Sequence, residues 1–257
     1  MTAAGPGFAR AVGALPPISL EAVEATAGLQ ARFDRKYILD AELLDRLALG
    51  ASCRALEIDG RRRFRYETVY FDTPDRRLYL DTAHRRPNRF KVRVRTYVDS
   101  DTSMLEVKRK DRRGKTEKGR LELAPGCDRR QLDSSMRDFV DASVSSNLTG
   151  QLVETITTSF DRSTIADLDH GARYTVDLGL VAAGVDGRTV RLEDAVVVEC
   201  KSAGRTTPLD RTLWALGIRP APMSKYCTTL AMLEPSLPAN RWHRTLDRYF
   251  GGRQRSA

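Results

Sequence analysis

The fold is decided by the stretch Asn88-Arg89-Phe90-Lys91-Val92-Arg93-Val94-Arg95-Thr96-Tyr97. Charged and apolar residues alternate along it with a period of two, which is the period of a β-strand. Successive side chains of a strand point to opposite faces, so the basic residues would share one face and the apolar residues the other. The basic face would carry Lys91, Arg93 and Arg95.

Three more segments show the same alternation, near residues 103–110, 116–124 and 195–201. Each of them places an ordered row of charges opposite an apolar row. Strands of this kind predict an antiparallel sheet, and if the charged rows converge, they line a basic cavity with a few carboxylates. Such a cavity suits a polyanion, above all a chain of phosphates. The charged positions are Glu106, Lys108 and Lys110, then Lys118, Arg120 and Glu122, and finally Glu199 and Lys201.

An ordinary sheet with one solvated face gives a similar pattern, because it also alternates apolar and polar residues. Solvated faces usually mix charges with Thr, Ser, Gln and Asn, whereas Arg and Lys dominate these rows. Like charges on neighbouring positions of one face also repel one another unless an anion lies among them. The rows together favour the anion-binding interpretation, and for any one strand the solvated sheet stays open.

The composition favours a globular protein with an anionic partner. The chain has 257 residues, 41% of them hydrophobic, enough for one large core or two small ones. Its formal net charge of +9 leaves nucleic acid, phosphorylated small molecules and anionic lipid open as partners. No apolar run approaches the roughly 20 residues of a membrane span. Reduced thiols and a cytoplasmic protein are expected, because no metal-ligand spacing links Cys53, Cys127, Cys200 and Cys227.

The chain shows no internal repeat and no clear linker, which favours a single domain over residues 18–234. Residues 1–17 are expected to form a flexible leader, and residues 235–257 a basic flexible tail. Apolar stripes with start and stop signals predict helices that would cover the apolar face of the sheet. These helices are expected near residues 19–29, 41–49, 208–216 and 225–233.

Six short motifs occur along the chain in a characteristic order. They are Arg32-x-Asp34-x-Lys36-Tyr37, Tyr70-Phe71-Asp72-Thr73, Lys91-x-Arg93-x-Arg95, Glu106-x-Lys108, Glu199-x-Lys201 and Ser224-Lys225-Tyr226. In this order they resemble the VTC domain, the polyphosphate-polymerase domain of the vacuolar transporter chaperone, within the CYTH-like triphosphate tunnel metalloenzyme superfamily. The resemblance covers residues 18–234 and implies an α+β fold: an antiparallel β-barrel that forms a tunnel, with a charged lumen and helices packed outside. An ordinary barrel instead fills its lumen with apolar side chains.

The resemblance also implies the residues of the site. Arginine forks and lysine point charges would bind phosphate oxygens, and Glu199 would bind a divalent metal, Mn or Mg. Ser224 and Lys225 would begin a helix, where free backbone N–H groups also face an anion. The expected catalytic residues are Arg93, Arg95, Glu199 and Lys201. The expected phosphate-binding residues are Lys36, Arg93, Arg95, Lys108, Lys118, Arg162, Arg173, Lys201, Ser224 and Lys225.

The sequence departs from the wider pattern at two places. Other superfamily members carry an ExExK motif on the first strand, where this chain has Phe33-Asp34-Arg35-Lys36 and keeps only one acid and the lysine. A metal site built on that strand is therefore not expected. Many VTC domains have Tyr-x-Arg where this chain has Phe160-x-Arg162, so one phosphate-contacting hydroxyl is missing.

Three functions compete. In a polyphosphate polymerase, the end of a growing chain attacks the γ-phosphate of ATP, and no protein nucleophile is needed. In a triphosphatase acting on tripolyphosphate or nucleoside triphosphates, water attacks instead and needs a base such as Glu106 or Glu122, or a metal-bound hydroxide. The third function is polyphosphate binding without catalysis. Nucleic acid is not expected, because no stacking aromatics interleave with the basic rows, and the sequence identifies no protein partner.

A surplus of cations favours the polymerase, because the basic rows hold more of them than one triphosphate needs. Replacing Arg93 and Arg95 together by alanine is expected to weaken triphosphate binding greatly. The fold is expected to survive this change, because it removes packed like charges.

Overall fold

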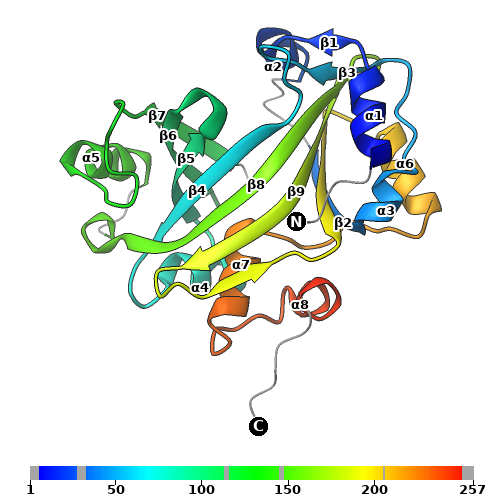
Figure 1. Ribbon diagram of the computed structural model, residues 1–257. Helices are drawn as coiled ribbons and strands as arrows, with labels where there is room; N and C mark the ends of the chain where they lie inside the picture. Colours follow the sequence, from blue (N-terminus) through cyan, green and yellow to red (C-terminus); the bar gives the residue numbers. More distant parts are fainter. Residues whose placement is uncertain (1–5, 28–32, 113–115, 145–147, 205, 251–257) are drawn as a thin grey trace. The chain divides into compact units, whose positions relative to one another are not determined.

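Two compact units make up the chain. Unit 1 consists of Met1–Phe64, Phe160–Leu180 and Leu192–Pro222, and unit 2 of Arg65–Ser159, Val181–Arg191 and Met223–Ala257. The computed structural model, with its elements labelled in Figure 1, describes residues 6–27, 33–112, 116–144, 148–204 and 206–250.

Unit 1 combines short helices with strands of one sheet. Its helices are α1 (Pro6–Ala14), α2 (Leu20–Ala27), α3 (Ala41–Leu44) and α6 (Pro208–Ala215). Its strands are β1 (Pro17–Ile18), β2 (Phe33–Asp40), β3 (Cys53–Leu56) and β11 (Ala195–Ser202). Two longer strands, β8 (Val153–Asp167) and β9 (Ala172–Gly184), contribute residues to both units.

The sheet of unit 1 has two unlike faces. Strand β11 pairs antiparallel with β2 on one side and with β9 on the other. The register sets Glu199 opposite Lys36 on β2 and opposite Thr175 on β9. Directly opposite residues share a face, and the next residue along a strand belongs to the other face. Cys200 and Tyr174 therefore lie on the apolar face, and the alternation predicted for this strand is confirmed.

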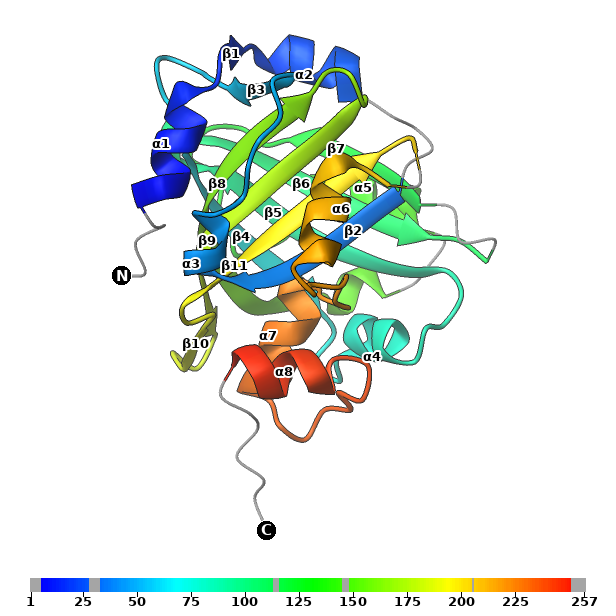
Figure 2. The ribbon, with the colours of Figure 1, turned by 90° about the vertical axis from the view of Figure 1, so that its right-hand side faces the viewer.

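Helices cover the apolar face of unit 1, whereas the helix predicted near residues 225–233 stacks its Tyr226 on Tyr70, which lies opposite Arg93 on the charged face of unit 2. Side chains of α1, α3 and α6 pack with the apolar face of unit 1 in one buried cluster, and Figure 2 shows α6 beside β11 and β2. The fully buried Asp210 of α6 accepts hydrogen bonds from Arg35 Nη2 at 2.7 Å and from the Tyr37 hydroxyl at 2.6 Å. Asp210 also forms a capping box with Thr207 at the start of α6. One carboxylate thus starts the helix and ties it to the sheet.

Helix α1 lies in the segment that was expected to be a flexible leader. Phe8 and Val12 are buried in the core of unit 1. The Asp45 carboxylate accepts a hydrogen bond from the backbone N–H of Phe8 at 2.7 Å, and Arg62 Nη1 donates to the Leu15 carbonyl at 2.8 Å. The small residues and glycines of this segment give no helix signal in the sequence. The helix forms because partners distant in sequence hold both of its ends. Asp45 directly follows α3, and its carboxylate is engaged by α1. Helix α3 therefore ends earlier than residue 49, where its end was expected.

Unit 2 is a second set of antiparallel strands with its own helices. Its strands are β4 (Phe64–Asp72), β5 (Arg89–Tyr97), β6 (Thr102–Lys110), β7 (Thr116–Glu122) and β10 (Thr189–Arg191). Its helices are α4 (Arg77–Ala83), α5 (Ser134–Ser143), α7 (Lys225–Leu233) and α8 (His243–Tyr249). Helix α8 lies in the segment that was expected to be a flexible tail, and it is held by Trp242 and Leu246, which are buried.

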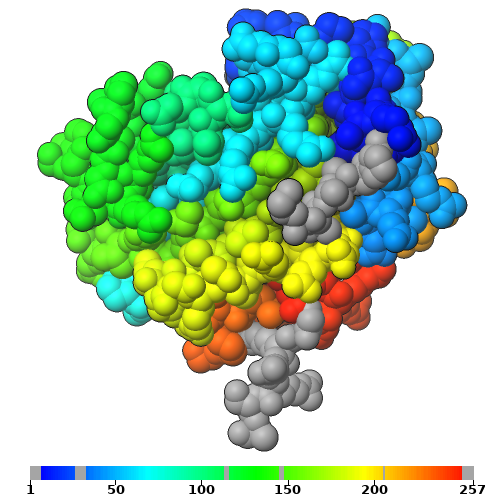
Figure 3. All heavy atoms as spheres, viewed as in Figure 1, coloured from blue at the N-terminus to red at the C-terminus, as the bar shows by residue number. Residues whose placement is uncertain are grey.

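The apolar face of β5, β6 and β7 packs against α5. Met136 and Val140 of this helix are buried in one cluster with Val92 and Val107 of the strands. Gly119 of β7 permits a close approach, since a Cβ atom there would lie 3.1 Å from Cζ of Phe139. The other side of α5 is exposed, and the helix is seen at the surface in green in Figure 3. The charged rows of these strands therefore occupy the face opposite α5.

The buried Asp72 connects three parts of unit 2. Its carboxylate accepts hydrogen bonds from the backbone N–H groups of Leu78 at 2.8 Å and Tyr79 at 2.9 Å, at the start of α4. It also accepts a hydrogen bond from the hydroxyl of Tyr226 on α7. Burial raises the pKa of Asp72, and these hydrogen bonds oppose that rise. Two of the sequence motifs, at residues 70–73 and 224–226, thus meet in one structural contact.

The strand pairing gives the order β2-β11-β9-β8-β4-β5-β6-β7, which is open in the described residues. The α+β class and the large antiparallel sheet are as predicted. The closed barrel that the resemblance implies stays a prediction. Among the described residues, no helix has the length and apolar character needed to cross a membrane.

Candidate functional site: two charged sheet faces

The charged face of unit 2 is arranged in rungs across β5, β6 and β7. The strand registers set Arg93 opposite Glu106 and Glu106 opposite Arg120. The next rung consists of Lys91, Lys108 and Lys118. Like charges directly opposite one another destabilise a sheet unless something anionic compensates them. An all-lysine rung is therefore suited to an anionic ligand, and it lies next to a rung that contains its own carboxylate.

Glu106 is the counter-ion of this face. Its side chain is 1% exposed, and its Oε2 lies 2.6 Å from Arg93 Nη2 and 3.9 Å from Arg95 Nη1. Its other oxygen, Oε1, forms an ion pair with Lys118 and lies 3.2 Å from Arg120 Nε. Cations from β5 and β7 therefore converge on one buried carboxylate of β6. Buried charges of this kind require partners, because isolated ones cost several kcal/mol.

The charges of this cluster are shifted by burial and by one another. Burial alone would raise the pKa of Glu106, but Arg93, Arg95 and Lys118 hold it well below its ordinary value. Burial also lowers the pKa of Lys118 to about 7, although Glu106 partly opposes that change. Glu106 is therefore ionised at neutral pH, while Lys118 is close to its titration midpoint.

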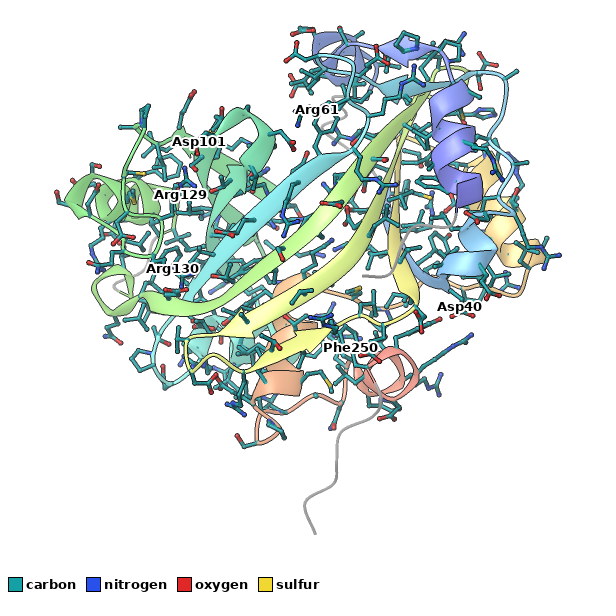
Figure 4. All side chains as sticks on the ribbon, viewed as in Figure 1. Asp40, Arg61, Asp101, Arg129, Arg130 and Phe250 are labelled. Carbon is teal, nitrogen blue, oxygen red and sulfur yellow. The ribbon has the colours of Figure 1, made fainter. Side chains whose placement is uncertain are left out.

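Surface ion pairs of the same unit differ from the Glu106 cluster in how exposed they are. Arg129 and Asp101, labelled in Figure 4, are paired at 2.5 Å, and the Asp101 side chain is 75% exposed. Arg130, also labelled, pairs with Glu154 at 2.7 Å and is 61% exposed. Exposed pairs contribute little to stability or function. The buried cluster around Glu106 is what distinguishes the charged face from this solvated surface.

The start of α7 joins the all-lysine rung. Lys91 Nζ donates a hydrogen bond of 2.8 Å to Oγ of Ser224. Ser224 is the N-cap of α7, as predicted, and its Oγ accepts a hydrogen bond from the backbone N–H of Cys227. Lys225 is the first residue of the helix. Unit 2 therefore brings together, among the predicted site residues, Arg93, Arg95, Lys108, Lys118, Ser224 and Lys225.

Unit 1 carries a second charged face on β2, β11 and β9. Lys201 lies opposite Asp34 on β2 and opposite Arg173 on β9, and the next rung contains Lys36 and Glu199. The predicted residues Lys36, Arg173, Glu199 and Lys201 therefore share one face. Arg32, the first residue of the motif that begins this row, lies outside the described residues.

Lys201 and Glu199 form a close pair. Lys201 Nζ lies 3.2 Å from Glu199 Oε2, and both side chains are nearly buried. Burial lowers the pKa of Lys201 to about 8; Glu199 opposes this shift, and the neighbouring Arg162 and Arg173 add to it. A lysine in this state gains a full charge readily when an anion binds beside it.

Arg162 has a partner that the sequence analysis did not identify. Its Nε and Nη2 donate to the two oxygens of Asp177 at 2.6 and 2.9 Å, and Asp177 is buried. Asp177 falls on the same face as Arg173 and Thr175, because strand residues two apart share a face. The alternation of residues 173–177 is the signal that would have found it. The guanidinium of Arg162, which was predicted to bind phosphate, thus forms an internal ion pair in this structure.

Other residues of the faces were missed as well. Lys91 and Arg120 were seen in the charged rows but were not assigned to the site, and Glu106 was considered as a base rather than as a counter-ion. The Tyr70 hydroxyl lies 3.4 Å from Arg93 Nη1 and extends the Glu106 cluster onto β4. Only the strand register, which sequence does not give, shows that these residues adjoin.

The described residues include no group of three or more His, Cys, Asp or Glu side chains that could hold a metal ion. Glu199 presents a carboxylate on a face rich in cations. A hard divalent ion such as Mg²⁺ is commonly held by one or two carboxylates together with substrate phosphates and water. A metal that arrives with a triphosphate would find its protein ligand in Glu199.

Comparisons with known proteins agree with the motifs. A family model described as the VTC domain matches residues 31–234. A comparison with curated protein sequences gave no match. Among solved structures, a putative adenylyl cyclase from Hippeastrum, described as having a dominant triphosphatase activity, is 16% identical with a TM-score of 0.45, over 77% of this chain and 94% of that one. A Pyrococcus horikoshii protein is 12% identical with a TM-score of 0.39, over 73% and 88% of the two chains. Likenesses at these scores are distant, and neither the family assignment nor the site depends on them.

Proposed function

Because this chain belongs to the VTC domain family, we propose that it is a polyphosphate polymerase-like phosphotransferase that moves the γ-phosphate of ATP onto a growing polyphosphate chain. A triphosphate or polyphosphate substrate fits the family and the charged faces of both units. We propose further the basic tunnel with a charged lumen that the resemblance implies, and that the protein acts in the cytoplasm, as its cysteine pattern led us to expect.

One observation carries the choice of polymerase: the charged face of unit 2 offers more cations than a triphosphate requires. Phosphoryl transfer depends mainly on positioning and on neutralising the charge of phosphate oxygens. Glu106 and Glu122 are the carboxylates of this face, and Glu106 is already saturated by its own cations. The cations of the face are Arg89, Lys91, Arg93, Arg95, Lys108, Lys110, Lys118 and Arg120. The surplus supports the binding of a longer phosphate chain.

In this reaction the ionised oxygen of the chain end attacks the γ-phosphorus of ATP. A new P–O bond forms, the bond between the γ-phosphorus and the bridging oxygen breaks, and ADP leaves with the electron pair. No side chain has to accept a proton. Lys and Arg side chains hold the reacting phosphates in line and balance their charge, and a divalent metal held by Glu199 would neutralise charge on the same oxygens.

The alternative, a triphosphatase, receives less support from this face. Water would have to lose a proton, and a general base works best when its pKa is near the working pH. The cations around Glu106 keep its pKa well below that range. Glu106 was named as a possible base from the sequence, and its surroundings make it a poor one.

The test is the product formed from ATP. Purified protein is incubated with ATP and Mn²⁺ or Mg²⁺, and long-chain polyphosphate is separated from free phosphate. We expect polymer from the wild type and a loss of most turnover in Glu199→Gln, with some ATP binding retained. Glu193→Gln, an exposed residue of unit 1, is the matched control and should behave as wild type. Free phosphate without polymer would favour the triphosphatase, and full activity of Glu199→Gln would place the metal elsewhere.

A further inference from the structure

An arginine cluster lies in unit 2, where the loop after α4 enters β5. Its members are Arg85 in that loop, Arg89 at the start of β5, and Arg241 just before α8. Helices α4, α7 and α8 lie together in Figures 1 and 2, and Arg241 Nη1 donates a 3.0 Å hydrogen bond to the carbonyl of Thr82 on α4. This bond fixes the guanidinium of Arg241 against the end of α4.

The cluster has positive charge without compensation in the described part of the chain. Nε of Arg241 is buried and has no hydrogen-bond partner there, and the exposed Arg85 side chain has neither a hydrogen bond nor an ion pair. The nearby carboxylate, Asp81, is engaged by Arg77 at 3.2 Å and by Arg86 at 3.6 Å. Burial and the proximity of Arg85 and Arg89 lower the pKa of Arg241. The backbone N–H of Arg85 donates to the same Thr82 carbonyl at 3.3 Å, so the two arginines meet at the end of α4. A buried donor and neighbouring like charges both indicate an anionic ligand.

Arg89 connects the cluster to the charged face described above. Strand residues two apart share a face, so Arg89 continues the row of Lys91 and Arg93 on β5, and it lies opposite Lys110. Arg89 and Arg93 are four positions apart, about 13 Å along the strand. A triphosphate held between the all-lysine rung and the Glu106 rung lies about 7 to 13 Å from Arg89 along the strand, whereas a longer phosphate chain lying along the row reaches it.

We propose that Arg85, Arg89 and Arg241 form a second anion site, which holds a distal segment of a polyphosphate chain that lies along the basic row of β5. The inference rests on the proposed function for the identity of the chain. The site would give the protein a preference for long chains over short ones. Polyphosphate is favoured over nucleic acid because the basic row that leads to the site is continuous. No exposed aromatic ring on β5 is available to stack with a base.

The experiment compares two ligands and two double variants by calorimetry at low salt. Arg85→Gln with Arg241→Gln removes two charges and keeps an amide donor at position 241. Arg244→Gln with Arg248→Gln removes two charges from exposed positions on α8 and is the matched control. Each protein is titrated with tripolyphosphate and with long-chain polyphosphate, and thermal unfolding verifies that each variant is folded.

We expect the Arg85/Arg241 variant to lose roughly tenfold in affinity for the long chain and to bind tripolyphosphate as the wild type does. Its affinity should also depend less steeply on salt, by roughly one to two units of the log–log slope. The control variant should change neither affinity by more than about twofold. Single-stranded DNA should compete poorly for the long-chain site.

Three results would overturn the inference: unchanged long-chain affinity, an equal loss for both ligands, or equal competition by DNA. An unfolded double variant would be replaced by Arg85→Gln alone, a change at an exposed position, and the same three results would then overturn the inference. Failure of the proposed function looks different, because the wild type itself would then bind no tripolyphosphate or form no polymer from ATP.

Discussion

Single residues on the charged faces have a structural role and a ligand-binding role at once. Arg93 was expected to be dispensable for folding, but its guanidinium compensates the buried Glu106. Replacing Arg93 and Arg95 by alanine would therefore cost stability as well as affinity, which corrects the expectation from sequence. Arg93→Lys, which keeps the charge but loses the fork, is the better probe of phosphate binding.

Glu106→Gln should destabilise the protein strongly. The change leaves Arg93, Lys118 and Arg120 without their shared counter-ion, and breaking a buried ion pair costs about 3–5 kcal/mol. Saturating tripolyphosphate should restore part of this loss, because its oxygens supply the missing negative charge and ligands stabilise the state they bind. Thermal unfolding with and without tripolyphosphate measures both effects.

The control is Glu117→Gln, in an exposed pair with Arg109 at 2.7 Å. It should change stability by less than about 1 kcal/mol. A Glu106→Gln protein as stable as this control would show that the cluster is not the buried counter-ion system described above.

Affinity for triphosphate should fall as pH rises from about 7.5 to about 9, where phosphate is already ionised. Lys201, with a pKa of about 8, loses its proton in this window, and Lys118, with a pKa of about 7, has lost most of its proton where the window begins; both must regain protons to bind an anion. Binding near pH 8 should take up protons, measured by calorimetry in buffers of different ionisation enthalpy. Lys118→Arg with Lys201→Arg should abolish the uptake, and proton release by the wild type would contradict the assignment.

The stability of the unliganded protein should respond to pH with the opposite sign. Both lysines have folded-state pKa values below the ordinary value of 10.5, so the unfolded chain binds more protons between about pH 7 and 10. Their contribution to the free energy of unfolding therefore increases with pH in that window. Urea unfolding at several pH values, compared between the wild type and the double arginine variant, isolates this contribution.

At the level of elements, helices hold the sheet faces in place through single polar contacts. Asp210 ties α6 to β2, and Asp72 ties α4 to α7 through Tyr226. The start of α7 carries Ser224 and Lys225, so the Asp72 contact also positions a part of the candidate site. Tyr37 and Tyr226 are far in sequence from these carboxylates, and each carboxylate satisfies backbone or hydroxyl donors that would otherwise be buried without a partner.

Phe8→Ala in α1 should lower the free energy of unfolding by about 3–5 kcal/mol, although sequence indicated a flexible leader. The Phe8 ring is 3% exposed and packs in the core of unit 1. Phe33→Ala is the matched control, because Phe33 is 48% exposed and its loss should cost less than about 1 kcal/mol. Urea unfolding of both variants decides, and equal stabilities would mean that α1 does not belong to the core.

For the whole molecule, the net charge of +9 should make ligand affinity and stability respond oppositely to salt. Raising the salt from about 0.05 M to about 0.5 M shortens the range of electrostatic attraction, so tripolyphosphate affinity should fall by at least roughly tenfold. The same screening reduces repulsion among the cations, so the melting temperature of the unliganded protein should stay constant or rise. Salt-independent affinity would argue against a binding site made of cations.

The sequence by itself determined the alternation of the charged strands, the order of the family motifs and the helices that begin at Pro208 and Lys225. These features depend on local spacing and on end signals, which are written in consecutive residues. The resemblance to the VTC domain followed from these features, and the family model that matches residues 31–234 confirms it.

The tertiary structure alone decided which charges meet. The register across β5, β6 and β7 makes Glu106 a shared counter-ion, and the neighbouring positions of β8 and β9 in the sheet give Arg162 its partner Asp177. It also decided that α1 is a helix, because Asp45 and Arg62 hold its ends from distant positions. Contacts between residues far apart in sequence depend on strand order and register, and a single strand's pattern shows a face without showing its neighbours.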